Sequence, residues 1–189
     1  MNVWDAITQR RTVQKYRKSE IPRDTLHRAL EAALTAPNHK HTYPWHFVVV
    51  GQETRRELME LVLANKLSKL TNPDDEARAK VAANVEAKMM NPAALVVFVQ
   101  KLCDDDFRCK EDYASVACAI QNFSIALTAE GYGSKWGSGA VTRSPKTYKL
   151  LGLDPETHEI SGFVFVGHSS VAFSERRRPA LSDVLRELP

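Results

Sequence analysis

Apolar residues recur along this chain at two spacings, one typical of helices and one typical of buried strands. Leu26, Leu30 and Leu34 fall on one helical stripe and predict a helix over 23–35. Other helices are expected at 53–69 and 75–90, and core strands at 47–50, 94–99 and 162–167. The helices and strands are interspersed without an internal repeat, so the pattern predicts a mixed α and β class.

One further segment, 112–130, has a helical pattern that is apolar on almost every side. A helix of this kind belongs in a core or in a subunit interface rather than on a free surface. Cys118, inside it, is expected to be a small packing residue. Gly131 and Gly133 provide the end of the helix.

The composition narrows the class of protein. With 189 residues, 43% hydrophobic and 26% charged, the chain is expected to form one soluble domain over 1–189. No apolar run approaches the about 20 residues that cross a bilayer. Residues 1–5 have neither a basic head nor an apolar signal core, so no export is expected. Cys103, Cys109 and Cys118 lack Cys-x-x-Cys spacing, which favours reduced thiols and a cytoplasmic location.

Basic residues gather near both ends of the chain. Arg10-Arg11-Thr12 follows a first helical turn, and Arg176-Arg177-Arg178 precedes Pro179. A guanidinium offers a fork of donors that matches phosphate, although blocks of charge are more often simply solvated. The net charge of +3 is too small to imply nucleic-acid binding. A joint phosphate site would require the two ends to meet.

Two loops carry further candidate chemistry. The segment 36–47 places His39, Lys40 and His41 near Trp45, which suits a planar ligand with polar edges. A metal site through the two histidines lacks a third ligand, so no metal is expected. The glycine-rich segment 133–139 could bring backbone amides close to a ligand, but taken alone it is predicted to be a turn.

In order and spacing, these four pieces together resemble the FMN-dependent nitroreductase family, and most of all its short, minimal members. The resemblance implies an α+β, nitroreductase-like fold with a central mixed, mainly antiparallel sheet flanked by helices. It also implies an intertwined homodimer with FMN at the subunit interface. The flavin-binding residues that it implies are Arg10, Arg11, Thr12, Thr35, His39, Trp136, Gly137, Ser138, Arg177 and Arg178.

In this family pattern, one subunit supplies the N-terminal motif and the tryptophan segment, and the other supplies the histidine loop. The arginines of both clusters would close on the phosphate, and 126–131 would lie near a nicotinamide. Two positions depart from the pattern. Gln14 stands where many members have a lysine, and Tyr43 stands where many have a glutamine before Pro-Trp.

The activity implied is an FMN-dependent oxidoreductase that uses NAD(P)H to reduce nitroaromatic or quinone-like acceptors in a ping-pong cycle. The cofactor carries the chemistry, so no catalytic side chain is named. Dehalogenation and heterocycle oxidation are alternatives on the same fold. A non-enzymatic nucleic-acid module is also considered, but aromatics interleaved with the basic residues are missing, and neither a nucleic-acid nor a membrane partner is expected.

Overall fold

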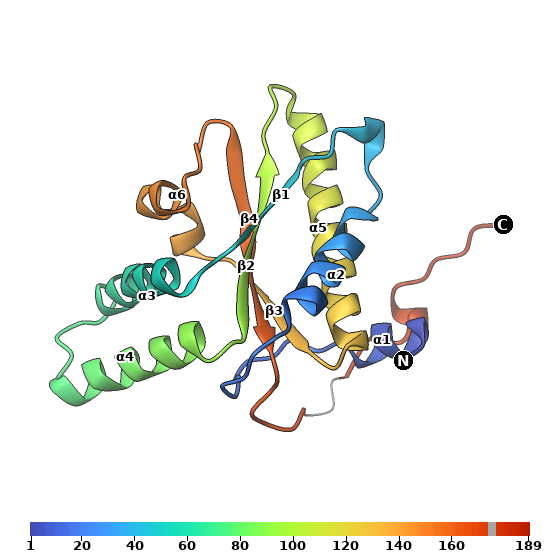
Figure 1. Ribbon diagram of the computed structural model, residues 1–189. Coiled ribbons are helices and arrows are strands. Elements are labelled where there is room, and N and C mark those ends of the chain that lie inside the picture. Colours follow the sequence, from blue (N-terminus) through green and yellow to red (C-terminus); the bar gives the residue numbers. More distant parts are fainter. Residues whose placement is uncertain (174–176) are drawn as a thin grey trace.

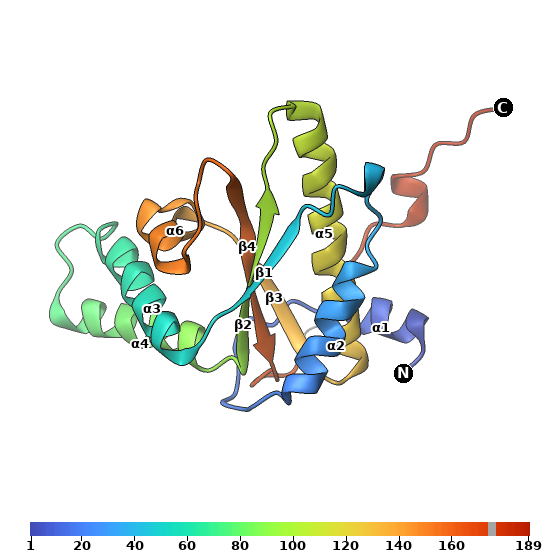
Figure 2. The same ribbon diagram turned by 45° about the horizontal axis from the view of Figure 1, so that its top comes forward.

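A four-stranded sheet runs through the middle of the protein, with helices on both of its faces (Figures 1 and 2). The computed structural model describes residues 1–173 and 177–189. The strands, in the spatial order β1-β2-β4-β3, are Trp45–Val49 (β1), Ala94–Lys101 (β2), His158–Gly167 (β4) and Gly133–Gly137 (β3). All three strand pairings are antiparallel. An isolated parallel bridge joins Thr12 to Ser134 at the β3 edge.

The helices lie in two groups. The α-helices are Val3–Gln9 (α1), Arg23–Leu34 (α2), Gln52–Leu67 (α3), Asp75–Met90 (α4), Asp106–Ala129 (α5) and Pro145–Leu151 (α6). Short 3-10 turns occupy His39–His41 (η1), Ala140–Arg143 (η2) and Leu181–Asp183 (η3). Figure 2 shows α3, α4 and α6 on one face of the sheet, and α2 and α5 on the other. None of the described helices is long and apolar enough to cross a bilayer.

The predicted helices at 23–35, 53–69 and 75–90 and the three predicted strands are confirmed, and most differences are at their ends. α5 begins at Asp106, six residues before the predicted start at 112, because the Asp105 carboxylate caps it by accepting a 2.6 Å hydrogen bond from the Arg108 amide. The prediction of a turn over 133–139 was wrong for its first five residues, which form β3. Pairing with β4 satisfies the backbone of this segment despite its glycines.

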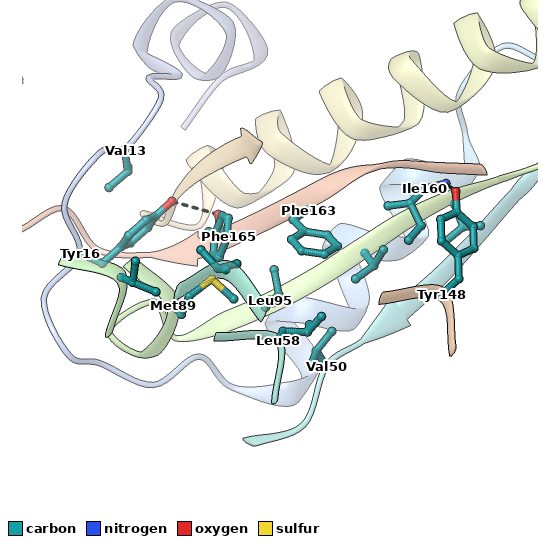
Figure 3. Packing of buried hydrophobic residues seen from close by; sticks show 14 residues of the cluster. Val13, Tyr16, Val50, Leu58, Met89, Leu95, Tyr148, Ile160, Phe163 and Phe165 are labelled. Carbon is teal, nitrogen blue, oxygen red and sulfur yellow. Dashed lines mark hydrogen bonds between the residues drawn. The ribbon is translucent and has the colours of Figure 1, made fainter. Parts of the chain in front are cut away.

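The core has two halves, because β2 is buried on both faces. Leu95, Val97 and Val99 face one cluster with α3 and α4, and the alternate residues face α2 and α5. In the first cluster, the Tyr16 hydroxyl donates a 3.1 Å hydrogen bond to the Phe165 carbonyl (Figure 3). The central strands therefore form a rigid base for the loops at their ends.

α5 turns its buried face to the sheet, with Phe123 and Leu127 fully covered. Its other side is less covered than the sequence predicted. Cys118 is exposed, so its interpretation as a packing residue was wrong for the single chain. Ala114 is exposed as well.

Candidate functional site

The N-terminal motif lies beside the edge strand β3. Thr12 bridges to Ser134, and the Val13 amide donates a 3.0 Å hydrogen bond to the Ser134 carbonyl. This approach requires glycine at position 133, because a Cβ there would lie 2.2 Å from a Val13 methyl group. The backbone therefore places two segments that are more than 120 residues apart in the sequence side by side.

Arg10 and Arg11 follow the end of α1. The Arg10 amide donates to the Ala6 carbonyl, and Arg11 Nη1 donates to the carbonyls of Thr8 and Arg10. A cation in this position complements the partial negative charge at a helix C-terminus. Arg11 and Thr12 also line a small cavity of about 120 Å³, together with Gln14 and residues 169 and 171–173.

On β3, the indole of Trp136 lies against Gly162 and is 40% exposed. Its Nε1 donates a 3.1 Å hydrogen bond to the Ser161 carbonyl. The next two residues, Gly137 and Ser138, line a second cavity of about 190 Å³. Phe163 and Phe165 are part of its wall, so the cavity combines an aromatic surface with the backbone of the glycine-rich segment.

Three lysines line this second cavity, and sequence reasoning did not identify them as site residues. Lys66 comes from the last turn of α3, Lys69 from the turn that follows it, and Lys88 from α4, and no carboxylate lines the cavity. Partial burial lowers the pKa of the Lys88 ammonium, and the charges of Lys135 and Lys66 lower it further. The cavity is therefore electropositive.

Lys135, on β3, connects this region to the N-terminal motif. Its ammonium donates a 2.5 Å hydrogen bond to Gln14 Oε1, and burial lowers its pKa. Among the described residues the one ion pair is Arg28–Glu130, so the cavity lysines and Lys135 have no carboxylate partner there. Uncompensated cations around a partly enclosed space favour an anion or a ligand that becomes negatively charged.

The histidine loop has a strained backbone. Lys40, His41 and Tyr43 adopt left-handed φ angles of 56°, 53° and 45°. Such conformations cost of order 1 kcal/mol or more for residues with a side chain, and they are common at binding sites. His39 is exposed in η1, and Tyr43 stands between His41 and Trp45 with ring centroids 5.9 and 6.2 Å away.

Hydrogen bonds to α5 hold this loop in place. Thr42 Oγ1 donates a 2.5 Å hydrogen bond to the buried carboxylate of Asp112. The Asn38 side-chain amide donates to Ser115 Oγ at 3.2 Å, and Asn38 Oδ1 accepts from the Tyr43 amide. The strained conformation is thus maintained by contacts with a helix rather than by the loop itself.

The remaining predicted residues lie elsewhere in the single chain. Thr35 ends α2, where its hydroxyl donates to Ala32 and accepts from Asn122 at 3.3 Å. It lines a shallow depression of about 450 Å³ that also includes residues of α1. Arg177 and Arg178 are exposed in the C-terminal segment, and Arg176 lies outside the described residues. Over the described ranges, no group of three or more metal-ligating side chains is placed to hold a metal ion.

Comparison with known proteins gives a consistent result. The model of the nitroreductase family matches residues 7–168. The chain is 27% identical over 186 residues to the Bacillus subtilis protein named "Putative NAD(P)H nitroreductase YfhC", covering 97% of this chain and 93% of that one. A nitroreductase-like protein from Bacillus cereus superimposes with a TM-score of 0.83 at 25% identity, covering 100% and 96% of the two chains. A nitroreductase from Bacteroides fragilis, solved with bound FMN, gives 0.77 at 26% identity, covering 99% and 100%.

Proposed function

The chain belongs to the nitroreductase family, and we propose that it is an FMN-dependent oxidoreductase that uses NAD(P)H to reduce nitroaromatic or quinone-like acceptors. One observation carries the proposal. The Arg10-Arg11-Thr12 motif is joined by the Thr12–Ser134 bridge to β3, the strand that leads into the Trp136-Gly137-Ser138 segment and its electropositive cavity. Donors that would suit an FMN phosphate and an FMN ring thus lie along the same strand.

The N-terminal motif would hold the phosphate. Guanidinium groups pair with phosphate oxygens through two parallel N–H donors, and the Thr12 hydroxyl adds a neutral donor. Arg11 Nη1 is engaged with backbone carbonyls, so the rest of its guanidinium would be used. Arg177 and Arg178 would complete the phosphate site by movement of the exposed C-terminal segment or from a second subunit.

The glycine-rich segment and the lysine-lined cavity would receive the ring. FMN supplies the redox chemistry when bound: it takes two electrons from a nicotinamide and passes them to an electron-poor acceptor in a ping-pong cycle. The protein would position the ring against Gly137 and Ser138, and the lysine ammonium groups would stabilise the negative charge that reduction creates. No side chain is needed as an acid or base, so we name no catalytic residue.

The proposal includes a homodimer, which two features of the single chain support. Thr35 directly follows α2, and His39 lies in the next loop. The predicted flavin residues of the N-terminal motif and of the glycine-rich segment that line a cavity lie beside β3 instead. Val3 and Trp4 of α1 are each 73% exposed, and Leu34 at the end of α2 is 51% exposed. Large apolar side chains exposed in this way are typical of surfaces that a partner covers. A second copy would bury them and bring its histidine loop to the flavin.

The proposal extends to the nicotinamide and to the acceptor. The segment 126–131 would lie near the nicotinamide, as the family resemblance implies. Dehalogenation or heterocycle oxidation would use the same cofactor site, so a panel of acceptors must separate these reactions from nitro and quinone reduction. The cytoplasmic location and the single-domain organisation over 1–189 stay predictions from the sequence.

The deciding experiment is a visible absorbance spectrum of the purified protein, repeated without oxygen after addition of NADH and then NADPH. A flavin spectrum that bleaches would support the cofactor and the first half-reaction together. A flavin spectrum that neither nucleotide bleaches would move the function to another electron donor. A colourless protein that does not take up added FMN would overturn the proposal.

The phosphate assignment has its own test. Arg10→Ala is expected to weaken FMN binding by at least about tenfold, since each charge-assisted hydrogen bond contributes about 1.5–3 kcal/mol. Arg56→Ala, which removes an exposed arginine from α3, is the matched control. Equal FMN retention by both variants would remove Arg10 from the phosphate site.

The lysine-lined cavity predicts an electrochemical result. Lys69→Gln is expected to lower the midpoint potential of bound FMN, because one cation that stabilises the reduced form is lost. The control is Lys146→Gln, which also removes one positive charge, but from the exposed side of α6 and outside the lining of this cavity. An unchanged potential in Lys69→Gln would separate this cavity from the flavin ring.

A further inference from the structure

Two of the three cysteines lie next to each other at the start of α5. Cys103 follows the end of β2, and Cys109 lies in the first turns of α5. Their sulfur atoms are 3.0 Å apart. The Cys103 amide donates to Cys109 Sγ at 3.2 Å, and the Cys109 thiol donates back to the Cys103 carbonyl at 3.1 Å. The two thiols therefore face each other across a short loop.

The surrounding backbone holds this arrangement. The Asp105 side chain caps α5, and the Cys109 amide donates to the Asp105 carbonyl at 2.9 Å. The side chain of Gln100, in β2, donates to the Cys109 carbonyl at 2.7 Å. Both cysteines are partly accessible to solvent. Cys118 is exposed and lies about two and a half turns beyond Cys109 on the same helix. A disulfide between Cys103 and Cys109 requires the sulfurs to approach by only about 1 Å.

We propose that Cys103 and Cys109 form a reversible redox-active disulfide that ties the first turn of α5 to the end of β2. With hydrogen peroxide as the oxidant, the Cys103 thiol gives up its proton, its sulfur attacks one peroxide oxygen, and the O–O bond breaks. The departing hydroxide takes up that proton and leaves as water, and Cys103 becomes a sulfenic acid. The Cys109 sulfur then attacks the Cys103 sulfur, the S–O bond breaks, and a second water is released. Two thiols and one peroxide thus give one disulfide and two waters.

The order of these two steps follows from the local hydrogen bonds. The contact with Cys103 raises the pKa of the Cys109 thiol, and burial and the nearby Asp112 carboxylate act in the same direction. Cys109 therefore forms a thiolate less readily than an ordinary cysteine, so we assign the first attack to Cys103. Reduction by an external dithiol reverses the reaction by thiol–disulfide exchange.

The disulfide would act on the histidine loop through α5. Asp112 lies one turn beyond Cys109, and its carboxylate accepts the hydrogen bond from Thr42. Ser115, on the same part of the helix, accepts from Asn38. A covalent link at Cys109 fixes the turn that anchors this loop, so oxidation is expected to stabilise the loop as well as the protein. This step does not depend on FMN binding.

The test begins with the whole protein treated with one equivalent of hydrogen peroxide, blocked with N-ethylmaleimide and weighed intact. Oxidised wild type is expected to carry one maleimide label, on Cys118. It is expected to carry three labels when dithiothreitol is added before the maleimide. Trypsin cleaves after Arg108, so the disulfide appears as peptide 102–108 joined to peptide 109–110. Three retained labels, a bond to Cys118, or a disulfide between two chains would each overturn the proposal.

Variants and a second readout complete the test. Cys118→Ser is the control and is expected to form the same bond, whereas Cys103→Ser cannot form it. The melting temperature of oxidised wild type is expected to exceed that of the reduced form by about 5 °C, as for a short closed loop. If Cys103→Ser fails to fold, the peptide map of wild type alone decides. An oxidised protein with the disulfide but an unchanged melting temperature would overturn the proposed tie between α5 and β2.

Discussion

The indole of Trp136 lies directly on Gly162 of the neighbouring strand. A Cβ at position 162 would lie 2.1 Å from Trp136 Nε1, which is closer than any side chain can tolerate. In the native protein the same nitrogen donates to the Ser161 carbonyl. The glycine thus allows the indole to lie across the neighbouring strand in this orientation.

Gly162→Ala is therefore expected to displace Trp136 and break this hydrogen bond. The overpacking should destabilise the protein by about 1–3 kcal/mol. Fluorine NMR of protein labelled with 5-fluorotryptophan should show one of its three tryptophan signals shifted. Gly51→Ala is the control, because a Cβ there meets no atom within 4 Å. Three unmoved signals would show that the indole does not depend on Gly162.

The sequence predicted the order of the helices and strands along the chain better than it predicted which of them lie next to each other. The stripe of Leu26, Leu30 and Leu34 and the apolar strands are local patterns. They can therefore be recognised from the sequence without knowledge of the fold. β3 was missed because its glycines carry little strand propensity, and the residues of β4 that pair with it lie 26 to 34 residues further along the chain. Strand formation there depends on the exposed edge of β4, which is a tertiary property.

The candidate site was predictable only where residues share a motif. Arg10-Arg11-Thr12 and Trp136-Gly137-Ser138 were recognised from the family pattern, and the fold pairs Thr12 with Ser134 on the strand that leads into the second segment. Lys66 lies on α3, Lys69 in the turn after it and Lys88 on α4. They meet in one cavity only through the packing of α3 and α4 on the sheet. Nothing in their spacing links them to position 137, so sequence alone could not place them there.

Removing the Thr42 hydroxyl is expected to release the histidine loop. In Thr42→Val the Asp112 carboxylate, 4% exposed, loses its 2.5 Å donor, at a cost of about 1–3 kcal/mol. The three left-handed residues of the loop then lack one of the contacts that hold them. Hydrogen exchange should become faster in 38–43, and urea unfolding should report the lower stability. Thr42→Ser keeps the hydroxyl and is expected to behave like wild type; equal exchange in both variants would contradict this role.

Arg55 is a structural clamp between α3 and the end of α4. Its guanidinium is 1% exposed, and it donates to the carbonyls of Met89 and Pro92, the latter at 2.6 Å. Arg55→Met fills similar space but leaves both carbonyls without their donor, so a loss of about 2–4 kcal/mol in the free energy of unfolding is expected. Urea denaturation measures this loss. Arg56→Met, on the exposed side of the same helix, should change stability by less than about 0.5 kcal/mol; a similar loss in both variants would argue against the clamp.

Tyr16 should make the protein sensitive to alkaline pH. Burial raises the pKa of its phenol above the usual value of 10.0, and the hydroxyl donates to the Phe165 carbonyl at 3.1 Å. Above pH 10 the unfolded chain ionises this group while the folded chain keeps its proton. The folded state then binds more protons than the unfolded state, so stability must fall as pH rises.

Tyr16→Phe isolates this effect, because it removes the phenol and keeps the ring. At pH 8 wild type is expected to be more stable than the variant by about 1 kcal/mol, the contribution of one buried hydrogen bond. Between pH 9 and pH 11 this advantage should shrink and then reverse, since only wild type carries the ionisable group at this position. Urea unfolding of both proteins at matched pH values measures the difference, and other titrating groups cancel in it. A difference that stays constant up to pH 11 would mean that the Tyr16 phenol ionises as readily in the folded protein as in the unfolded chain, and so is not protected by the core around Phe165.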